Sequence, residues 1–342
     1  MSSRKRAVRF AVSIGLAVVL LALFLRNLDF AAVGAALRNA HPGWLVTAAV
    51  AGLVATPPIR SWRWGRLLKG YRASALDLNS ATAIGFAAST LLPARAGEVV
   101  RPVALSRSAA LPLAPCLVSI ALERLIDLLV TIALFVVFAL GWAPQALTGD
   151  EASRFALLRR SAFLLGAGTV AGVALLTLFA ARPDLARRLA APVLRLFPER
   201  FSARLASILD SLLSGLAALR TVRDAGIVAA LSVLLWLVIC FQIWATLKAF
   251  DLELPYPVSF FVLTWAVLGL AIPTPGGVGG YHAAVAYALA GFYAVPKNTA
   301  AAFALASHAV SFVPITLLGL GFLVAGGFSL KNLADERPPN VP

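Results

Sequence analysis

Charged residues are scarce in this sequence. They make up 13% of its 342 residues, against 60% hydrophobic residues, whereas soluble domains carry about 25% charged and roughly 45–50% apolar residues. This composition excludes a soluble globular protein. Cysteine is also nearly absent. Cys116 and Cys240 both lie in apolar stretches, so neither a disulfide framework nor a cysteine metal site is expected.

The sequence contains long apolar runs that lack charged residues. About 20 apolar residues cross the ~30 Å hydrocarbon layer of a bilayer as a helix. The apolar positions are continuous and do not alternate, which excludes a membrane barrel. The sequence therefore predicts an all-α polytopic membrane protein. The runs without Asp, Glu, Lys or Arg cover residues 10–25, 39–59, 78–94, 108–122, 128–149, 161–181, 225–247, 254–296 and 298–330.

Basic residues outnumber acidic ones by 30 to 15, and they lie between these runs. Residues 60–72 hold five basic and no acidic side chains, and residues 182–223 hold eight arginines against three acidic residues. Because cytoplasmic loops are rich in Lys and Arg, both segments and both termini are expected on the cytoplasmic side of the cell (inner) membrane. The net charge of +15 then indicates topology and anionic lipid partners, and no nucleic-acid partner.

Two apolar segments are expected to fold back on themselves. Residues 73–124 connect neighbouring spans so that both of their ends lie in the cytoplasm, which requires a hairpin. The run 254–296 has 43 residues, about twice what one helix needs to cross the bilayer, and Pro273 marks its turn. The two hairpins therefore enter the membrane from opposite faces.

The turns of the two hairpins resemble each other at a distance of 180 positions. Span, broken hairpin and span would thus be repeated with inverted topology, as in many secondary transporters, whose substrate site lies where the broken helices meet. We predict about six full spans plus two broken or re-entrant hairpins in an inverted repeat. Alternatively, proline and glycine punctuate two unrelated hairpins. The matching residues are Leu92, Pro93 and Gly97 in the first turn and Ile272, Pro273 and Gly277 in the second.

This pattern divides the chain into five parts. They are an N-terminal span and outer segment at 1–40, a first repeat at 41–149, a connecting span and cytoplasmic amphipathic helix at 150–224, a second repeat at 225–330 and a disordered tail at 331–342.

The densest polar cluster lies between two apolar helices, at residues 91–107. Ionisable groups at bilayer depth are costly and therefore indicate function. Gly97 begins a helix whose free N–H groups would point toward the turn, and together with Arg95 and Arg101 they suit a phosphate. Glu98 belongs to the same candidate substrate site. Alternatively, the segment is an ordinary hydrophilic loop with its arginines in water.

A second polar cluster consists of Glu123, Arg124 and Asp127. Glu123 and Asp127 lie four residues apart on one helical face, where like charges repel unless a cation lies between them or one is protonated. Arg95 or Arg101, brought back by the hairpin, is the expected cation. The cluster is either a structural salt-bridge network or a proton-coupled site.

The turn at residues 272–282 is the uncharged counterpart of the first. Its glycines would let the backbone approach a ligand or another helix closely. His282 and His308 are candidates for proton transfer, although a lone histidine more often packs against neighbours. The candidate substrate-binding residues here are Pro273, Gly276, Gly277, Gly279, Gly280 and His282.

Trp62 and Trp64 alternate with Arg60 and Arg63 at the end of the second span. Tryptophan and arginine at this position are typical of an interfacial anchor. The alternative is that Arg63 contacts a lipid head group, and we retain it among the candidate substrate-binding residues.

Four motifs in order resemble a known family. They are RSWRWGRLL from residue 60, LLPARAGEVVRPVAL from residue 91, ERLIDL from residue 123 and IPTPGGVGGYHAAV from residue 272. Together they resemble the flippase-like transmembrane domain of lysylphosphatidylglycerol synthases and the stand-alone membrane proteins related to it. The resemblance covers about residues 7–325.

The resemblance implies transport of lipids or lipid-linked head groups between leaflets, with both turns facing a central cavity. No soluble aminoacyl-transferase domain follows the last span, so we expect no lipid synthesis, no catalytic residue and no cofactor. The rival hypotheses are a membrane-embedded enzyme acting on a lipid-linked substrate and a scaffold of a lipid-modifying complex. The sequence leaves open whether the protein forms a homo-oligomer. The acidic residues of the outer segments, which have no metal-like spacing, are Asp29, Asp150, Glu151, Asp251 and Glu253.

Overall fold

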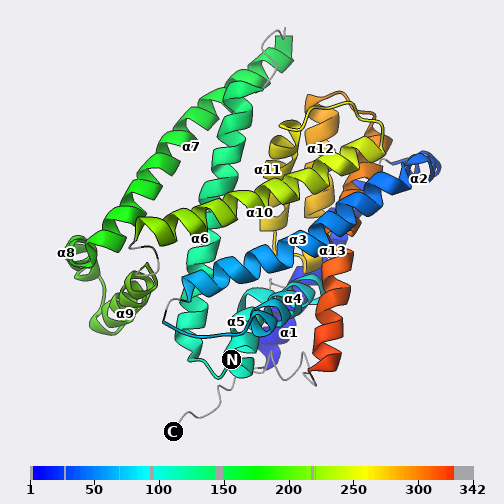
Figure 1. Ribbon diagram of the computed structural model, residues 1–342. Coiled ribbons are helices and arrows are strands. Elements are labelled where there is room, and N and C mark those ends of the chain that lie inside the picture. Colours follow the sequence, from blue (N-terminus) through cyan, green and yellow to red (C-terminus); the bar gives the residue numbers. More distant parts are fainter. Residues whose placement is uncertain are drawn as a thin grey trace.

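The regular structure of the described residues is helical. The computed structural model describes residues 3–26, 28–68, 70–92, 96–142, 149–216, 219 and 221–326. In chain order (Figure 1), the elements are α1 (Ser3–Leu25), α2 (Phe30–Asn39), α3 (Pro42–Leu67), α4 (Ala75–Leu91), α5 (Gly97–Ser108), α6 (Leu113–Gly141), α7 (Gly149–Ala181), α8 (Pro183–Leu194), α9 (Glu199–Leu216), α10 (Val222–Ala249), α11 (Val258–Ala271), the 3₁₀ turn η2 (Pro275–Gly277), α12 (Gly280–Phe292) and α13 (Lys297–Ala325).

Within the described part of the chain, five helices are long and apolar enough to cross a membrane: α3, α6, α10, α13 and the part of α7 at Phe155–Ala181. A sixth span results if α1 and α2, which bend sharply against each other, are counted together. The predicted all-α multi-pass membrane protein is thereby confirmed. The predicted tail at 331–342 lies outside the described residues.

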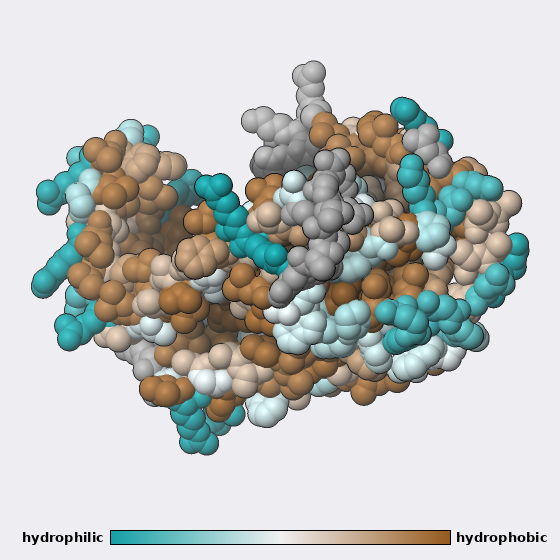
Figure 2. All heavy atoms as spheres, turned by 90° about the horizontal axis from the view of Figure 1, so that it is seen from above, coloured by the Kyte–Doolittle hydropathy of each residue, from teal (hydrophilic) through white to brown (hydrophobic). Residues whose placement is uncertain are grey.

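Much of the protein surface is apolar. In α7, for example, Phe163 is 70% exposed and Val170 72% exposed, and this helix runs along one side of the molecule (Figure 1). Figure 2 shows hydrophobic side chains over much of another face. Exposed apolar surface of this extent is unfavourable in water and favourable against lipid tails, so these faces fit a bilayer.

Each helix of the two predicted hairpins is too short to cross a bilayer on its own. The second arms, α5 with 12 residues and α12 with 13, are about 18–20 Å long, well below the ~30 Å hydrocarbon thickness. In both hairpins the arms approach through glycine. A Cβ on Gly97 would lie 1.9 Å from the carbonyl oxygen of Gly85, and a Cβ on Gly269 would lie 2.5 Å from that of Gly280. Side chains at these crossings would force the arms apart.

One predicted boundary was wrong. We expected the first hairpin to extend to residue 124, but its second arm ends at Ser108 and α6 runs without a break from Leu113 to Gly141. The charged residues around Glu123 break the apolar run in the sequence. They do not end the helix, because their charges are paired inside the protein.

The segments of the two predicted repeats pack in matching pairs. Helices α3 and α10 lie side by side (Figure 1), α4 of the first hairpin packs against α13, and α11 of the second hairpin packs against α6. Exchanging the two sets of helices turns the α4–α13 pair into the α11–α6 pair and leaves the α3–α10 pair unchanged. This pattern supports the inverted repeat, which stays a prediction.

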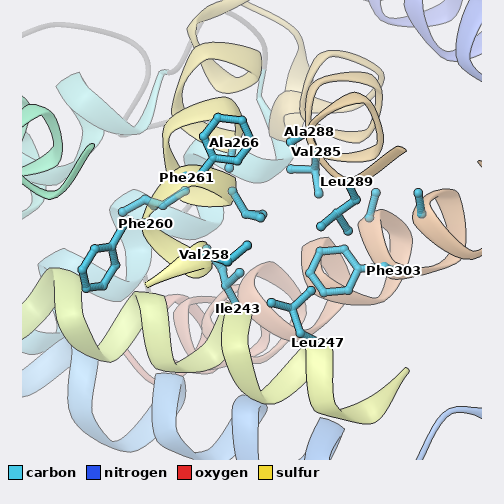
Figure 3. Packing of buried hydrophobic residues seen from close by; sticks show 14 of the residues in the cluster. Ile243, Leu247, Val258, Phe260, Phe261, Ala266, Val285, Ala288, Leu289 and Phe303 are labelled. Carbon is cyan, nitrogen blue, oxygen red and sulfur yellow. The ribbon is translucent and has the colours of Figure 1, made fainter. Parts of the chain in front are cut away.

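Most of the hydrophobic core belongs to the C-terminal half. Figure 3 shows Phe303 of α13 between Leu247 of α10 and Leu289 of α12. These side chains and Phe261 of α11 are fully buried. Between the two halves, α9 forms where an amphipathic helix was predicted, and it packs Leu213 and its neighbours against α6 and α7.

A glycine pair on α13 tests the contact with the first hairpin. A Cβ on Gly319 would lie 2.2 Å from the carbonyl oxygen of Ala83 in α4, whereas a Cβ on Gly321 would meet no atom within 4 Å. Gly319→Ala should therefore cost about 1–3 kcal/mol through overpacking, and Gly321→Ala should change stability by at most about 1 kcal/mol. Thermal unfolding of both variants in detergent measures the difference. Equal melting temperatures would contradict this packing.

Candidate functional site

Seven ionisable side chains from three helices gather in the first half of the molecule. We call this group the arginine–carboxylate cluster. It comprises Arg60 and Arg63 of α3, Glu98 and Arg101 of α5, and Glu123, Arg124 and Asp127 of α6.

Glu123 is the centre of the cluster. Its Oε1 lies 2.6 Å from Nη1 of Arg101, 3.1 Å from Nη2 of Arg63 and 3.2 Å from Nη2 of Arg124. The Glu123 side chain is completely buried, as is that of Arg63. The expected pairing of Arg101 with this acidic pair is thereby confirmed.

Asp127 joins the cluster to the second half of the molecule. Its Oδ1 accepts hydrogen bonds from Nη1 of Arg63 at 2.6 Å and from Nε1 of Trp236 at 3.0 Å. Nη1 of Arg63 also donates to Oγ of Ser232 at 3.1 Å. Trp236 and Ser232 belong to α10, so the cluster connects α3, α6 and α10.

The cluster lies deep within the helices that are long enough to span. Glu123 is ten residues after the start of α6 at Leu113, about 15 Å along the axis and thus near half of the ~30 Å hydrocarbon thickness. Unpaired charges at such a depth cost several kcal/mol. Mutual pairing is what allows them to stay ionised there.

The expectation of a cation between Glu123 and Asp127 was met in part. Arg63 and Arg124 each contact both carboxylates, whereas Arg101 contacts only Glu123. Arg95, the other expected cation, lies outside the described residues. A second expectation was wrong. Trp64 is not an interfacial anchor. Its side chain is fully buried, its Nε1 donates to Oγ of Ser119 at 2.8 Å, and the guanidinium of Arg101 lies 4.2 Å above its ring. One face of this end of α3 therefore lies inside the protein, where Arg63 and Trp64 have buried partners, whereas Trp62 is 58% exposed.

Only part of the first turn lies within the described residues. Glu98 Oε2 lies 3.3 Å from Nε of Arg124, so it belongs to the cluster. Gly97 faces α4 closely, and its assignment to substrate binding stays a prediction. Pro93 and Arg95 lie outside the described residues, and the predicted anion site at Arg95 is therefore untested.

The glycine-rich turn packs against other helices. Gly276, Gly277 and Gly279 have φ of +58°, +73° and +84°, a region that favours glycine. A Cβ on Gly276 would lie 3.2 Å from the carbonyl oxygen of Thr90 at the end of α4, and one on Gly279 would lie 2.7 Å from Cβ of Leu20 in α1. The second turn thus reaches the hairpin of the first half.

Two histidines, both in the second half, also meet at this turn. The ring centroids of His282 and His308 are 4.7 Å apart. Nδ1 of His282 lies 3.3 Å from the backbone N of Gly279, and Nε2 of His308 lies 2.7 Å from the carbonyl oxygen of Gly276. Pro273 accepts a hydrogen bond from Oγ of Ser13 at 2.6 Å. The residues of the turn stay predicted substrate contacts.

A cavity of about 210 Å³ adjoins the cluster. Both halves of the molecule line it. Arg60 and Arg124 form its charged side, Gln242 and Tyr281 add polar atoms, and apolar side chains of α11 and α13 form much of the remainder. Further lining residues are Phe86, Trp236, Leu263, Val267, Leu270, Val310, Ser311 and Ile315.

Arg60 and Trp236 were not among the predicted site residues. Arg60 stood in a basic segment that the charge count placed in the cytoplasm. Trp236 stood within an uncharged apolar run. The spacing of Arg60 three residues before Arg63 was the one available signal, because such residues share a helical face.

Three of the acidic residues that an enzymatic alternative would use have local partners, and the side chains of the other two, Asp150 and Glu151, lie outside the described part of the structure. Asp29 caps α2 through the backbone N–H groups of Ala31 and Ala32. Asp251 lies 3.0 Å from Nε2 of His41, and Glu253 pairs with Lys248. Among the described residues, no three His, Cys, Asp or Glu side chains lie close enough together to hold a metal ion.

These features define a multi-pass helical membrane protein with an ion-pair cluster beside an internal cavity. The chain matches the family described as the lysylphosphatidylglycerol synthase TM region over residues 8–319, and it belongs to that family. It is also 29% identical over 359 aligned positions to the glycosyltransferase AglD of Haloferax volcanii. The alignment covers 97% of this chain and spans 56% of the length of that protein.

Neutralising the centre of the cluster should reveal how much the fold depends on it. Glu123→Gln leaves Arg101 without its buried counter-charge and Arg63 with Asp127 alone, and it should cost about 3–5 kcal/mol. Glu98, whose side chain is 37% exposed, is the matched control, and Glu98→Gln should cost about 1 kcal/mol or less. Thermal unfolding in lipid nanodiscs measures both. If Glu123→Gln unfolds at the wild-type temperature, the buried pairing is refuted.

Proposed function

We propose that the protein transports a membrane lipid or a lipid-linked head group between the leaflets of the cell (inner) membrane, with both termini in the cytoplasm. The observation that carries this proposal is the cavity that both halves of the molecule line, charged on one side and apolar on the other. A polar head group and its hydrocarbon tails need such a divided environment.

The arrangement of the hairpins supports the same proposal. Transporters with inverted repeats bind substrate where broken helices from the two halves meet, and they rock one half against the other. Here η2 of the second hairpin contacts α4 of the first, and Thr316 of α13 donates to Oγ1 of Thr90 at 3.1 Å. The two hairpins thus meet close to the cavity, where their relative motion would open it to either leaflet.

A second candidate function is the membrane part of a glycosyltransferase that uses a lipid-linked sugar. The similarity to AglD, a glycosyltransferase by its name, favours it. In this case the cavity would hold the lipid carrier. Transfer of the sugar would require catalytic side chains other than the residues of the cluster and the cavity. Both candidates share a lipid in the cavity and differ in whether the lipid changes leaflet.

Filling the cavity should stop transport without unfolding the protein. Ser311 of α13 lines the cavity, whereas Val313, two residues further on, is 52% exposed on the outer surface. Ser311→Trp should abolish transport because indole would occupy the space of the head group, and Val313→Trp should retain it. The measurement is the leaflet distribution of labelled anionic phospholipid in liposomes containing the purified variants.

The outcomes separate the candidates. The proposed function is supported if the wild-type protein and Val313→Trp transport the lipid and Ser311→Trp does not. Transport by Ser311→Trp at the wild-type rate would contradict the cavity as the route. If the wild-type protein binds the lipid but leaves it in its original leaflet, the transport proposal fails and the glycosyltransferase candidate is favoured.

A further inference from the structure

Arg60 stands apart from the other arginines of the cluster. Its side chain is only 9% exposed, and its closest carboxylate contact is Nη1 to Oε1 of Glu123 at 4.0 Å, too long for a hydrogen bond. This Nη1 is buried and has no hydrogen-bond partner. The guanidinium lies 4.8 Å from the ring centroid of Phe86, which holds it in place without neutralising it.

The remaining arginines have carboxylate partners at short distance. Arg63 and Arg101 each have a contact of 2.6 Å, with Asp127 and Glu123 respectively. Arg124 lies within 3.5 Å of three carboxylates. Among the described residues, the cluster therefore contains four guanidinium groups and three carboxylates, which leaves one positive charge. Arg60 is the arginine without a short carboxylate contact. A buried charge without a close partner is strongly unfavourable, so a site is left for one negative charge.

The surroundings of Arg60 restrict what that negative charge belongs to. Arg60 lines the cavity together with apolar side chains of α11 and α13, such as Leu263 and Ile315. A hydrophilic anion would leave those side chains in contact with water or with its own hydration shell. A phospholipid satisfies both sides, because its phosphate is next to its hydrocarbon chains and a guanidinium binds phosphate oxygens through two parallel hydrogen bonds.

We propose that Arg60 binds the phosphodiester of a membrane phospholipid, and that the single unbalanced charge of the cluster selects a head group carrying one phosphate negative charge. The inference rests on the proposed function for the location of the lipid. It places the anion contact at Arg60. A phosphomonoester carries about half to one additional negative charge at neutral pH, and the described residues of the cluster offer no further unpaired cation for it.

Lipid binding by the full-length protein in detergent tests this assignment. The probes are phosphatidylglycerol, phosphatidic acid, diacylglycerol and glycerophosphoglycerol, titrated against intrinsic tryptophan fluorescence and native mass spectra. Phosphatidylglycerol should bind the wild-type protein about tenfold or more tightly than diacylglycerol, the difference expected for a charged hydrogen bond. Phosphatidic acid should bind no more tightly than phosphatidylglycerol.

Arg60→Gln is the decisive variant. It should lose about tenfold or more of the affinity for phosphatidylglycerol and leave that for diacylglycerol unchanged. Arg66→Gln is the matched control, since Arg66 lies on the same helix with a side chain 40% exposed, 4.0 Å from Asp224. The control should keep wild-type affinity. Wild-type affinity for phosphatidylglycerol in Arg60→Gln would overturn the proposal.

A purely structural role of Arg60 has a different signature. If Arg60 mainly stabilised Glu123, Arg60→Gln would lower the melting temperature of the lipid-free protein. We expect that temperature to stay the same or to rise, because an unpaired buried charge is removed, while the stabilisation by phosphatidylglycerol disappears. A lowered lipid-free melting temperature with retained stabilisation by lipid would refute the binding role.

The probes also separate the sources of the phosphate. Glycerophosphoglycerol has the same diester without tails and should bind far more weakly than phosphatidylglycerol. Equal binding would refute the lipid assignment and indicate a soluble phosphate ester. Failure of the proposed function is a separate result. If Arg60→Gln loses phosphatidylglycerol binding while wild-type protein moves no lipid between leaflets, the anion contact holds and transport does not.

Discussion

The carboxylate of Glu123 is the group on which the rest of the site depends. Three arginines from α3, α5 and α6 approach it within 3.2 Å, and Arg101 depends on it alone among the carboxylates of the cluster. Through Arg63 the same network reaches Asp127, and through Asp127 it reaches Trp236 of α10. Glu123 thereby holds the first hairpin against two spans, and Asp127 extends the network to the second half.

Glycine complements this electrostatic constraint with a steric one. In each hairpin the two arms touch where a glycine of one arm faces a glycine of the other, Gly85 with Gly97 and Gly269 with Gly280. Close backbone contact lets short helices bury their polar ends without long side chains between them. Broken helices of this kind are tolerated at membrane depth only where protein or a cavity surrounds them, and the cavity between the two halves meets that condition.

The sequence predicts the membrane class and the turns well, because apolar length and proline position are local properties. It also predicts the pairing of Arg101 with Glu123, since a hairpin must return one to the other. The role of Arg63 and Arg60 and the burial of Trp64 could not be predicted in the same way. A charge count assigns a basic segment to water, and only the tertiary positions of Glu123 and Asp127 show that Arg63 is paired inside the protein and that Arg60 is buried beside the same network.

The two halves differ in charge while their helices pack in matching pairs, and this difference bears on mechanism. When the predicted repeats are aligned at the 180-residue distance between their turns, Asp127 corresponds to Ser307, which is next to His308. The charged network of the first half thus has an imidazole in the corresponding region of the second, close to His282. An anionic head group in the cavity would be attracted strongly by one half and weakly by the other. In the proposed transport, the first half would retain the head group while the second half, whose described cavity-lining side chains are uncharged, moves past it. A cavity charged on both sides would resist that movement.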